Sequence, residues 1–243
     1  MCKGKFYLIR EDMEFLGGFG CVKWKNSYEN IILNKKELFE LRTYKYEKRR
    51  ISYFLGRIAA KKAISELGNG QKLDSVFIDR GVFGFPVVKG LNNGNVQVSI
   101  SHTDEIAVAI AFPEDHPMAV DIEKTQNNEV NGILLDQMTK KEFEIQKKMN
   151  LQDSSFALFW SFKEALSKVL KTGLTLELKY IEIEKIDKNG DYFVATFSSF
   201  PQYKGVSFYS FDHFYSIVLP KYTTLNLDEI RNDFEKTLSH NRD

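Results

Sequence analysis

Apolar residues between Leu158 and Leu170 recur at steps of three and four, which predicts an amphipathic α-helix whose apolar stripe lies on a core. Gly173 follows the last periodic residue and predicts the C-terminal end of this helix. Because consecutive residues are about 100° apart, Glu164 and Lys168 are neighbours on the face opposite the stripe. A glutamate followed by a lysine at this spacing is most often a solvated pair that stabilises a helix weakly, so the pair alone does not indicate a site.

A second segment, residues 118–125, alternates apolar and polar positions and predicts a β-strand. Val120 and Ile122 lie on one face of this strand, and Asp121 and Glu123 lie on the other. Two carboxylates on one strand face repel each other unless a cation or water lies between them. This strand favours a functional role for the polar face of the helix.

Another helix is expected over residues 47–67, with an apolar stripe that includes Phe54, Ile58 and Ala63. Asn34 is a suitable cap for a shorter helix before it. Basic residues surround the first half of the longer helix, and a solvated helix face is the ordinary interpretation of such a group. These residues are Lys48, Arg49, Arg50 and Arg57.

A helix followed by short strands occurs twice along the chain. The last strands of the two series end at Pro113 and Pro220, 107 positions apart. Asn189-Gly190 predicts a hairpin in the second series. The first series of strands is expected at 76–79, 85–89, 96–101 and 106–112, and the second at 180–185, 192–197, 206–211 and 215–219.

This order predicts an internal duplication in the α+β class, with a helix packed on an antiparallel sheet in each of two similar halves. We expect an N-terminal half over 1–117, a C-terminal half over 118–223 and a tail over 224–243 that forms a partly ordered helix. A pseudo-twofold axis is expected to relate the halves, with a ligand cleft where they meet. The glycines within residues 17–20 lack the Gly-Lys-Ser/Thr ending of a phosphate-binding loop, and predict a turn.

Composition narrows the possible classes of protein. The chain has 243 residues, of which 43% are hydrophobic and 28% charged, and no apolar run is long enough to span a membrane. Its formal net charge of +1 gives no electrostatic case for binding nucleic acid or a membrane. Only Cys2 and Cys21 are present, and no apolar signal core follows Met1, so we expect a cytoplasmic protein without structural disulfides.

The candidate chemistry is that of a hard cation. No Ser/His/Asp set, Cys-x-x-Cys or His-x-x-x-His pattern points to a hydrolase or a zinc protein. Asp121, Glu123 and Glu164 together offer oxygen donors for Mg²⁺. His102 stands in a predicted strand, where a lone histidine usually forms structural hydrogen bonds.

Three segments, taken in order, resemble the motifs of the Sfp-type 4′-phosphopantetheinyl transferases. They are residues 98–103 (VSISHT), 119–125 (AVDIEKT) and 160–168 (WSFKEALSK). Residues 55–63 (LGRIAAKKA) and 84–86 (GFP) also lie where that family has counterparts. The resemblance covers roughly residues 40 to 220, and the combination of Asp-x-Glu with Trp-x-x-Lys-Glu-x-x-x-Lys is its specific part.

The resemblance implies a monomeric enzyme that transfers the phosphopantetheine arm of coenzyme A to a serine of an apo acyl or peptidyl carrier protein, and releases adenosine 3′,5′-bisphosphate. It implies that Asp121, Glu123 and Glu164 hold Mg²⁺ and that Glu164 and Lys168 are catalytic. It also implies a set of contacts to coenzyme A. These contacts are Lys48, Arg49, Arg50, Arg57, Ser101, His102, Lys163 and Lys168.

Two questions stay open from the sequence. Many relatives have a lysine where this chain has Phe85, so one phosphate contact is either missing or supplied by Lys89. A catalytically silent relative that binds coenzyme A or a carrier protein is the alternative function. The presence of four residues argues against it: Asp121, Glu123, Glu164 and Lys168. The basic helix over residues 139–149 is a candidate surface for an acidic carrier protein.

Overall fold

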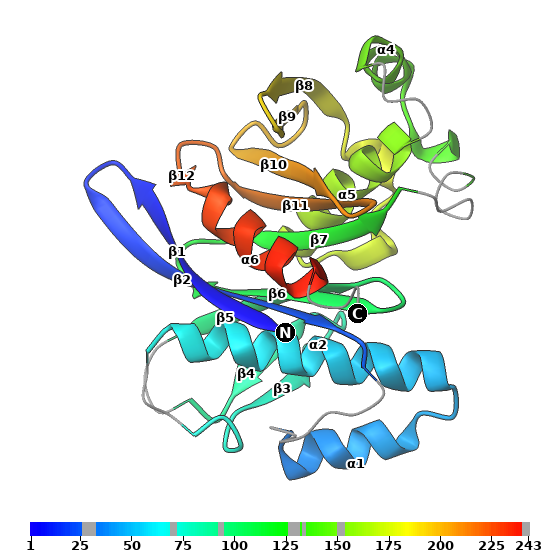
Figure 1. The fold of residues 1–243 in the computed structure, drawn as a ribbon. Helices are drawn as coiled ribbons and strands as arrows, with labels where there is room; N and C mark the ends of the chain where they lie inside the picture. The colour runs from blue at the N-terminus through cyan, green and yellow to red at the C-terminus, as the bar shows by residue number, and fades with distance from the viewer. Residues whose placement is uncertain are drawn as a thin grey trace. The chain divides into compact units, whose positions relative to one another are not determined.

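The computed structural model describes residues 1–25, 33–68, 72–91, 95–125, 132, 135–149 and 154–239. The chain forms two units, each with its own antiparallel sheet (Figure 1). Unit 1 contains Met1–Pro117 and Tyr222–Asp243, and unit 2 contains Met118–Lys221. The expected α+β class, with helices packed on antiparallel sheets, is confirmed.

The sheet of unit 1 has the strand order β12-β1-β2-β6-β5. Its strands are β1 (Cys2–Arg10), β2 (Met13–Lys23), β5 (Val96–His102), β6 (Ile106–Pro113) and β12 (Thr224–Leu225). A separate hairpin is formed by β3 (Phe77–Arg80) and β4 (Pro86–Lys89).

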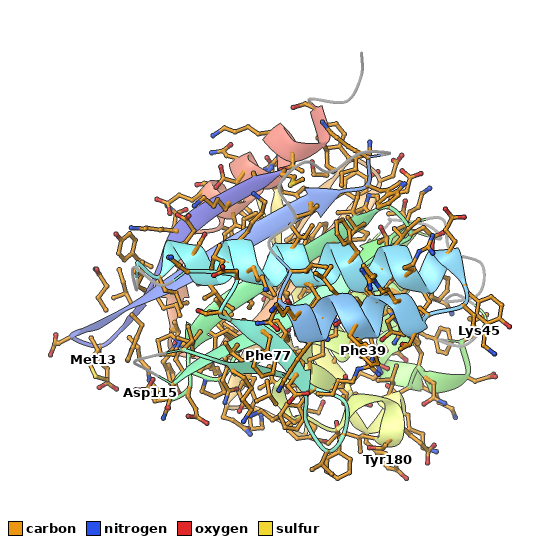
Figure 2. The ribbon with its side chains drawn as sticks, turned by 90° about the horizontal axis from the view of Figure 1, so that it is seen from below. Met13, Phe39, Lys45, Phe77, Asp115 and Tyr180 are labelled. Atoms are coloured by element: carbon orange, nitrogen blue, oxygen red, sulfur yellow. The ribbon has the colours of Figure 1, made fainter. Side chains whose placement is uncertain are left out.

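Helices cover both faces of this sheet. The helices are α1 (Lys35–Thr43), α2 (Glu47–Glu66) and α6 (Leu227–Ser239). A Cβ on Gly18 would meet the backbone of α2, whereas a Cβ on Gly4 would meet Asp233 of α6, so α2 and α6 lie on opposite faces. Phe39 projects from α1 into solvent (Figure 2) and is 74% exposed.

The residues 17–20 form part of strand β2, and the turn expected there was a wrong prediction. The reason is helix packing: a Cβ on Gly18 or Gly20 would lie 2.0 and 2.2 Å from the carbonyl oxygens of Ala63 and Ala59. Glycine in a strand interior often marks such a close approach of another backbone. These glycines let α2 lie directly on the strand.

The residues after 221 belong to unit 1. We expected the C-terminal half to run to residue 223 and residues 224–243 to form a tail with a partly ordered helix. Strand β12 pairs with β1, and α6 buries Ile230, Phe234 and Leu238 against unit 1. The segment is therefore a packed part of that unit as far as Ser239.

The sheet of unit 2 has the strand order β7-β11-β10-β9-β8. Its strands are β7 (Ala119–Lys124), β8 (Ile183–Asn189), β9 (Tyr192–Phe197), β10 (Tyr203–Ser210) and β11 (His213–Pro220). Its helices are α4 (Lys140–Met149), α5 (Ser154–Val169), η1 (Gly173–Thr175) and η2 (Leu178–Tyr180). The β8–β9 hairpin turns at Gly190, whose φ of 62° is suited to glycine.

Most side chains of helix α5 are buried, on the sheet of unit 2 and on its neighbouring segments α4 and η2. Its apolar stripe, with Phe159, Phe162 and Leu166 fully buried, joins the core formed with β8, β9 and β11. Its polar side faces β7 and β11, where the Ser161 and Ser216 hydroxyls are 2.6 Å apart. The face of α5 that carries Lys168, which we expected to lie opposite the core, therefore lies against the edge strand β7.

The two units repeat the same plan. The order α1, α2, β5, β6 in unit 1 corresponds to α4, α5, β10, β11 in unit 2, and β2 and β7 pair with β6 and β11 respectively. Because the ladder registers match, Asp121 of β7 stands where β2 has Gly20. The repeat predicted from the sequence is present, and its two copies differ at this position.

Candidate active site

The Lys168 ammonium is the centre of a cluster of charged groups on β7 and α5. Its Nζ atom lies 2.6 Å from Oδ1 of Asp121 and donates a second hydrogen bond to the carbonyl of Val120 at 3.2 Å. Asp121 is 3% exposed and Lys168 is 26% exposed. Lys168 therefore pairs with Asp121 of β7. Its spacing from Glu164 alone would have suggested a solvated pair within the helix.

Two further carboxylates, Glu123 and Glu164, lie close enough to this pair to interact with it electrostatically. Burial and the charge of Asp121 raise the pKa of Glu164 to about 7, although Lys168 opposes the shift. Burial, Asp121 and Glu164 raise the pKa of Glu123 to about 9, against the effects of Lys168 and of the Trp160 hydrogen bond. For Lys168, burial lowers the pKa, but the attraction of the carboxylates outweighs burial and the pKa is raised.

The donor atoms fit Mg²⁺ in kind. Three carboxylates supply the hard oxygen ligands that this ion prefers. Within the described ranges, however, no three Asp, Glu, His or Cys side chains are arranged to hold a metal ion as they stand. The Lys168 ammonium is bonded to Asp121, so metal binding requires a local rearrangement of side chains. The metal site stays a proposal.

Lys163 is the sequence candidate that the structure separates from this cluster. Its side chain is 0% exposed, and its ammonium lies 2.8 Å from Glu142 of α4 and donates to the carbonyl of Leu178 at 2.9 Å. An ammonium enclosed in this way cannot reach a bound phosphate without leaving the core. We therefore remove Lys163 from the proposed contacts to coenzyme A.

The remaining basic candidates lie in unit 1, around the N-terminal half of α2 and the end of β5. Lys48 pairs with Asp104 in the turn after β5 at 2.7 Å, which brings these two ends together. His102 is exposed at the end of β5, and Ser101 beside it is buried. The Arg57 guanidinium stacks on Tyr53 at 4.4 Å. Arg49 and Arg50 are exposed on the same turn of α2.

Two residues that contact the candidate residues, one at the charged cluster and one at Lys163, were not assigned a role from the sequence. Trp160 donates a hydrogen bond to Glu123, and Glu142 balances the charge of Lys163. The position of Glu142 at the start of a helix had a sequence signal. Thr139 followed by Glu142 is a capping box, and the two residues form its reciprocal hydrogen bonds.

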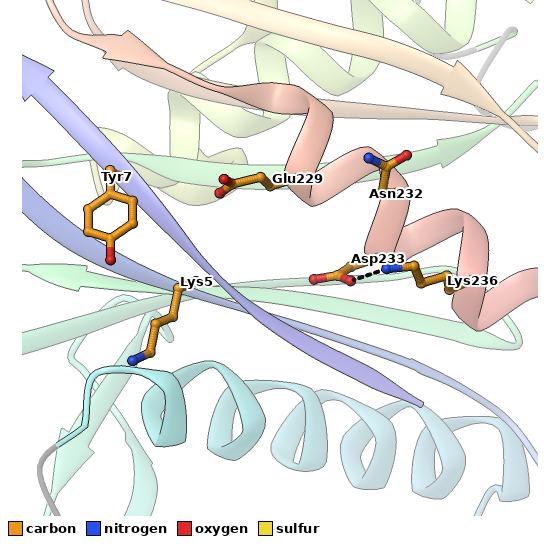
Figure 3. A pocket seen from close by; sticks show the side chains of 6 residues that line it. All are labelled: Lys5, Tyr7, Glu229, Asn232, Asp233 and Lys236. Carbon is orange, nitrogen blue, oxygen red and sulfur yellow. Dashed lines mark ion pairs between the residues drawn. The ribbon is translucent and has the colours of Figure 1, made fainter.

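A shallow pocket of about 350 Å³ lies between β1 and α6 in unit 1 (Figure 3). Its lining is polar, and Lys236 pairs with Asp233 at 3.5 Å. The lining residues are Lys5, Tyr7, Glu229, Asn232, Asp233 and Lys236. It contains neither of the candidate sets above, and no residue in it was predicted to act.

Comparison with known proteins decides the family. Residues 117–216 match the family described as the 4′-phosphopantetheinyl transferase superfamily, and residues 41–112 match the 4′-phosphopantetheinyl transferase N-terminal domain. The chain belongs to the 4′-phosphopantetheinyl transferase superfamily. A holo-[acyl-carrier-protein] synthase of Anaplasma phagocytophilum (strain HZ) is 28% identical over 96 residues, which are 36% of this chain and 79% of that protein.

The match to the N-terminal domain indicates the Sfp-type branch of this superfamily, and the chain is accordingly a phosphopantetheinyl transferase. The charged cluster falls in the segment 117–216, and the basic candidates of unit 1 fall in the segment 41–112. No helix in the parts that the structure describes is both long and apolar enough to cross a membrane.

The raised pKa of Glu123 makes the stability of the metal-free transferase depend on pH. The unfolded chain loses this proton near the ordinary glutamate pKa of 4.5, and the folded chain keeps it up to a pKa of about 9. The folded state therefore binds more protons in this interval, so the free energy of unfolding falls as the pH rises. Glu123→Gln removes this effect. Between about pH 5 and about pH 9 the free energy of unfolding should therefore fall less in Glu123→Gln than in the wild type, and the two decreases should differ by about 1 kcal/mol or more.

Urea unfolding in the presence of a chelator measures this difference. Glu144→Gln, at an exposed position on α4, is the control and should follow the wild type. Equal pH slopes for Glu123→Gln and the wild type would show that Glu123 does not keep its proton in the folded protein.

Proposed function

We propose that this transferase moves the 4′-phosphopantetheine arm of coenzyme A onto a serine of an apo carrier protein in a Mg²⁺-dependent reaction, releasing adenosine 3′,5′-bisphosphate. Family membership and the similarity to a holo-[acyl-carrier-protein] synthase support this reaction. The observation that carries the proposal is the group of three carboxylates beside Lys168, one of which has a pKa of about 7.

Glu164 is the proposed general base. In the metal-free transferase its pKa is raised to about 7, chiefly by burial, so part of the carboxylate is ionised near neutral pH and can accept a proton. In the reaction, the serine oxygen forms a bond to the β-phosphorus of coenzyme A while the bond from that phosphorus to the bisphosphate breaks. The serine proton passes to Glu164, and the electron pair of the broken bond leaves with the bisphosphate.

Lys168 is the proposed source of positive charge for the leaving group. In the metal-free transferase its ammonium is held at Asp121 and Val120, and it would leave the Asp121 oxygen when Mg²⁺ binds and be available to the leaving group. Transfer of a phosphoryl-type group depends mainly on positioning and charge neutralisation. Asp121, Glu123 and Glu164 would hold Mg²⁺, which supplies further positive charge to the pyrophosphate oxygens when bound.

Basic residues of unit 1 are proposed to bind the phosphates of coenzyme A. His102 and Ser101 at the end of β5 are donors for the 3′-phosphate, with Arg50 on the adjacent end of α2. The other contacts proposed are Lys48, Arg49 and Arg57. Many relatives have a lysine where this chain has Phe85. Lys89 at the end of β4 is exposed, so it is proposed to make the phosphate contact that this lysine makes in those relatives.

The surface of α4 is proposed to receive the carrier protein through charge. Four lysines, which we call the α4 lysines, are exposed on this helix: Lys140, Lys141, Lys147 and Lys148. Phe143 and Ile145 pack against the core of unit 2, so they do not form an apolar centre for docking. The proposal therefore rests on the α4 lysines and an acidic partner.

The base role predicts that Glu164→Gln loses turnover and keeps coenzyme A affinity. The amide preserves the shape of the side chain but cannot accept the serine proton, so kcat should fall by about 100-fold or more. Intact mass spectrometry of apo carrier proteins measures the transfer, and calorimetry measures coenzyme A binding. Glu184→Gln, on the exposed side of β8, is the control and should retain full turnover.

Three outcomes separate the roles. Loss of turnover and of coenzyme A binding together would indicate that Glu164 mainly holds the metal. Wild-type turnover in Glu164→Gln would remove it as the base. No transfer by the wild type to any carrier protein, with coenzyme A still bound, would favour the alternative of a catalytically silent binding module.

The assignment of the 3′-phosphate predicts a difference between two ligands. His102→Ala and Arg50→Ala should each weaken binding of coenzyme A by about tenfold, because each removes one hydrogen bond to a charged group. Binding of dephospho-coenzyme A, which lacks the 3′-phosphate, should be unchanged. Lys188→Ala in the β8–β9 hairpin should affect neither ligand. Equal weakening of both ligands by His102→Ala would contradict the assignment.

Carrier docking predicts a dependence on charge and salt. Replacing the α4 lysines by glutamate should raise KM for an acidic carrier protein by about tenfold or more, with kcat little changed. Added salt should weaken docking of the wild type and should have a smaller effect on the variant. The measurement is the transfer rate against carrier concentration at several salt concentrations. Unchanged kinetics in the variant would place the docking surface elsewhere.

A further inference from the structure

A fully enclosed ion pair, Glu142 with Lys163, lies next to the charged cluster on α5. The Lys163 ammonium contacts both carboxylate oxygens of Glu142, at 2.8 and 2.9 Å, and both side chains are 0% exposed. It also donates to the carbonyls of Leu178 at 2.9 Å and Gln137 at 3.3 Å. All three hydrogens of the ammonium therefore have acceptors within the unit.

Glu142 extends this contact to the sheet. Its Oε1 atom accepts the backbone N–H of Ile183 at 2.8 Å, and its Oε2 atom accepts that of Thr139 at 2.9 Å. The pair thus joins the start of α4, the 3₁₀ turn η2, the start of β8 and the middle of α5. Four segments of unit 2 are therefore connected through this one ion pair.

Unit 1 contains the same arrangement. Lys61 of α2 lies 2.7 Å from Glu37 of α1, and both are buried. Its ammonium donates to the carbonyl of Leu73 at 3.1 Å, and Glu37 accepts the backbone N–H groups of Ile78 and Asn34. Glu37, Leu73, Ile78 and Asn34 are each 105 positions before Glu142, Leu178, Ile183 and Thr139. The duplication has therefore kept these four contacts in both copies.

The surroundings of the two pairs differ in one respect. The residue after Lys163 is Glu164 of the charged cluster, and the residue after Lys61 is Lys62. The strand beneath α5 carries Asp121, whereas the equivalent strand beneath α2 has Gly20. Unit 1 thus contains a copy of the ion pair, but the three carboxylates of the charged cluster have no equivalent beside it.

We propose that Glu142 and Lys163 are positioning residues that fix the rotation of α5 and so aim Glu164 and Lys168 at β7. This inference rests on the proposed function, because it concerns the geometry of the proposed reaction site. Lys163 and Glu164 project about 100° apart on the helix, so any roll of α5 that moves one moves the other. A misplacement of about 1 Å at a catalytic group can reduce a rate about 100-fold.

A pair of double variants tests the proposal. Glu142→Gln/Lys163→Met removes both buried charges in unit 2, and the amide oxygen still accepts the N–H of Ile183. Glu37→Gln/Lys61→Met makes the same change in unit 1 and is the matched control. Since the ion pairs are alike, both variants should show a similar shift in melting temperature.

Only the unit 2 variant should change the site. We expect kcat for transfer to fall by about tenfold or more in Glu142→Gln/Lys163→Met, with KM for coenzyme A within about threefold, and kcat to stay within about threefold in the control. Mn²⁺ titration followed by the electron paramagnetic resonance of the free ion gives a second readout. Binding should weaken by about tenfold or more in the unit 2 variant only.

The outcomes separate this inference from the proposed function. Equal changes in the two variants, in kcat or in Mn²⁺ affinity, would show that the pair contributes to stability alone and would overturn the inference. The proposed function would still stand if the wild type transferred the phosphopantetheine arm. If the wild type transferred nothing, the proposed function would fail, and the Mn²⁺ titration would still decide the inference. Absence of Mn²⁺ binding by the wild type would overturn it.

Discussion

Three carboxylates share one ammonium at the contact of β7 with α5, and this imbalance of charge determines the properties of the site. Lys168 neutralises Asp121 at 2.6 Å, which leaves Glu123 and Glu164 without an equal counter-charge. Burial is the larger cause, and this excess of negative charge the smaller, of the raised pKa of both glutamates, about 9 for Glu123 and about 7 for Glu164. A cation that binds here must compete with protons and with Lys168 for the same oxygens.

The duplication shows how such a site can be added to a fold without changing its plan. In unit 1 the helix lies directly on Gly18 and Gly20, with no room for a side chain at either position. In unit 2 the position of Gly20 holds Asp121, and the Lys163 pair keeps α5 in the same relation to its neighbours as Lys61 keeps α2. One copy thus uses the contact of helix and strand for packing, and the other places charged groups in it.

Local patterns in the sequence predicted the fold well, because helical and strand periodicity and the Asn189-Gly190 turn are local signals. The strand at residues 17–20 was missed because its glycines are explained only by the helix that packs on them. The burial of Lys163 was missed for a similar reason, since its partner Glu142 is 21 positions away and lies on another helix. The polar face of α5 was expected to lie away from the core, because periodicity cannot show that an edge strand covers it.

Proton release on metal binding tests the central claim most directly. If Glu123 and Glu164 hold protons in the free transferase, binding of Mg²⁺ near pH 7 must release protons to the buffer. Calorimetry in buffers of different ionisation enthalpy measures that number, and the account predicts close to one proton or more, falling when Glu123 is replaced by glutamine. Mg²⁺ binding without proton release, or unchanged release in Glu123→Gln, would contradict the account.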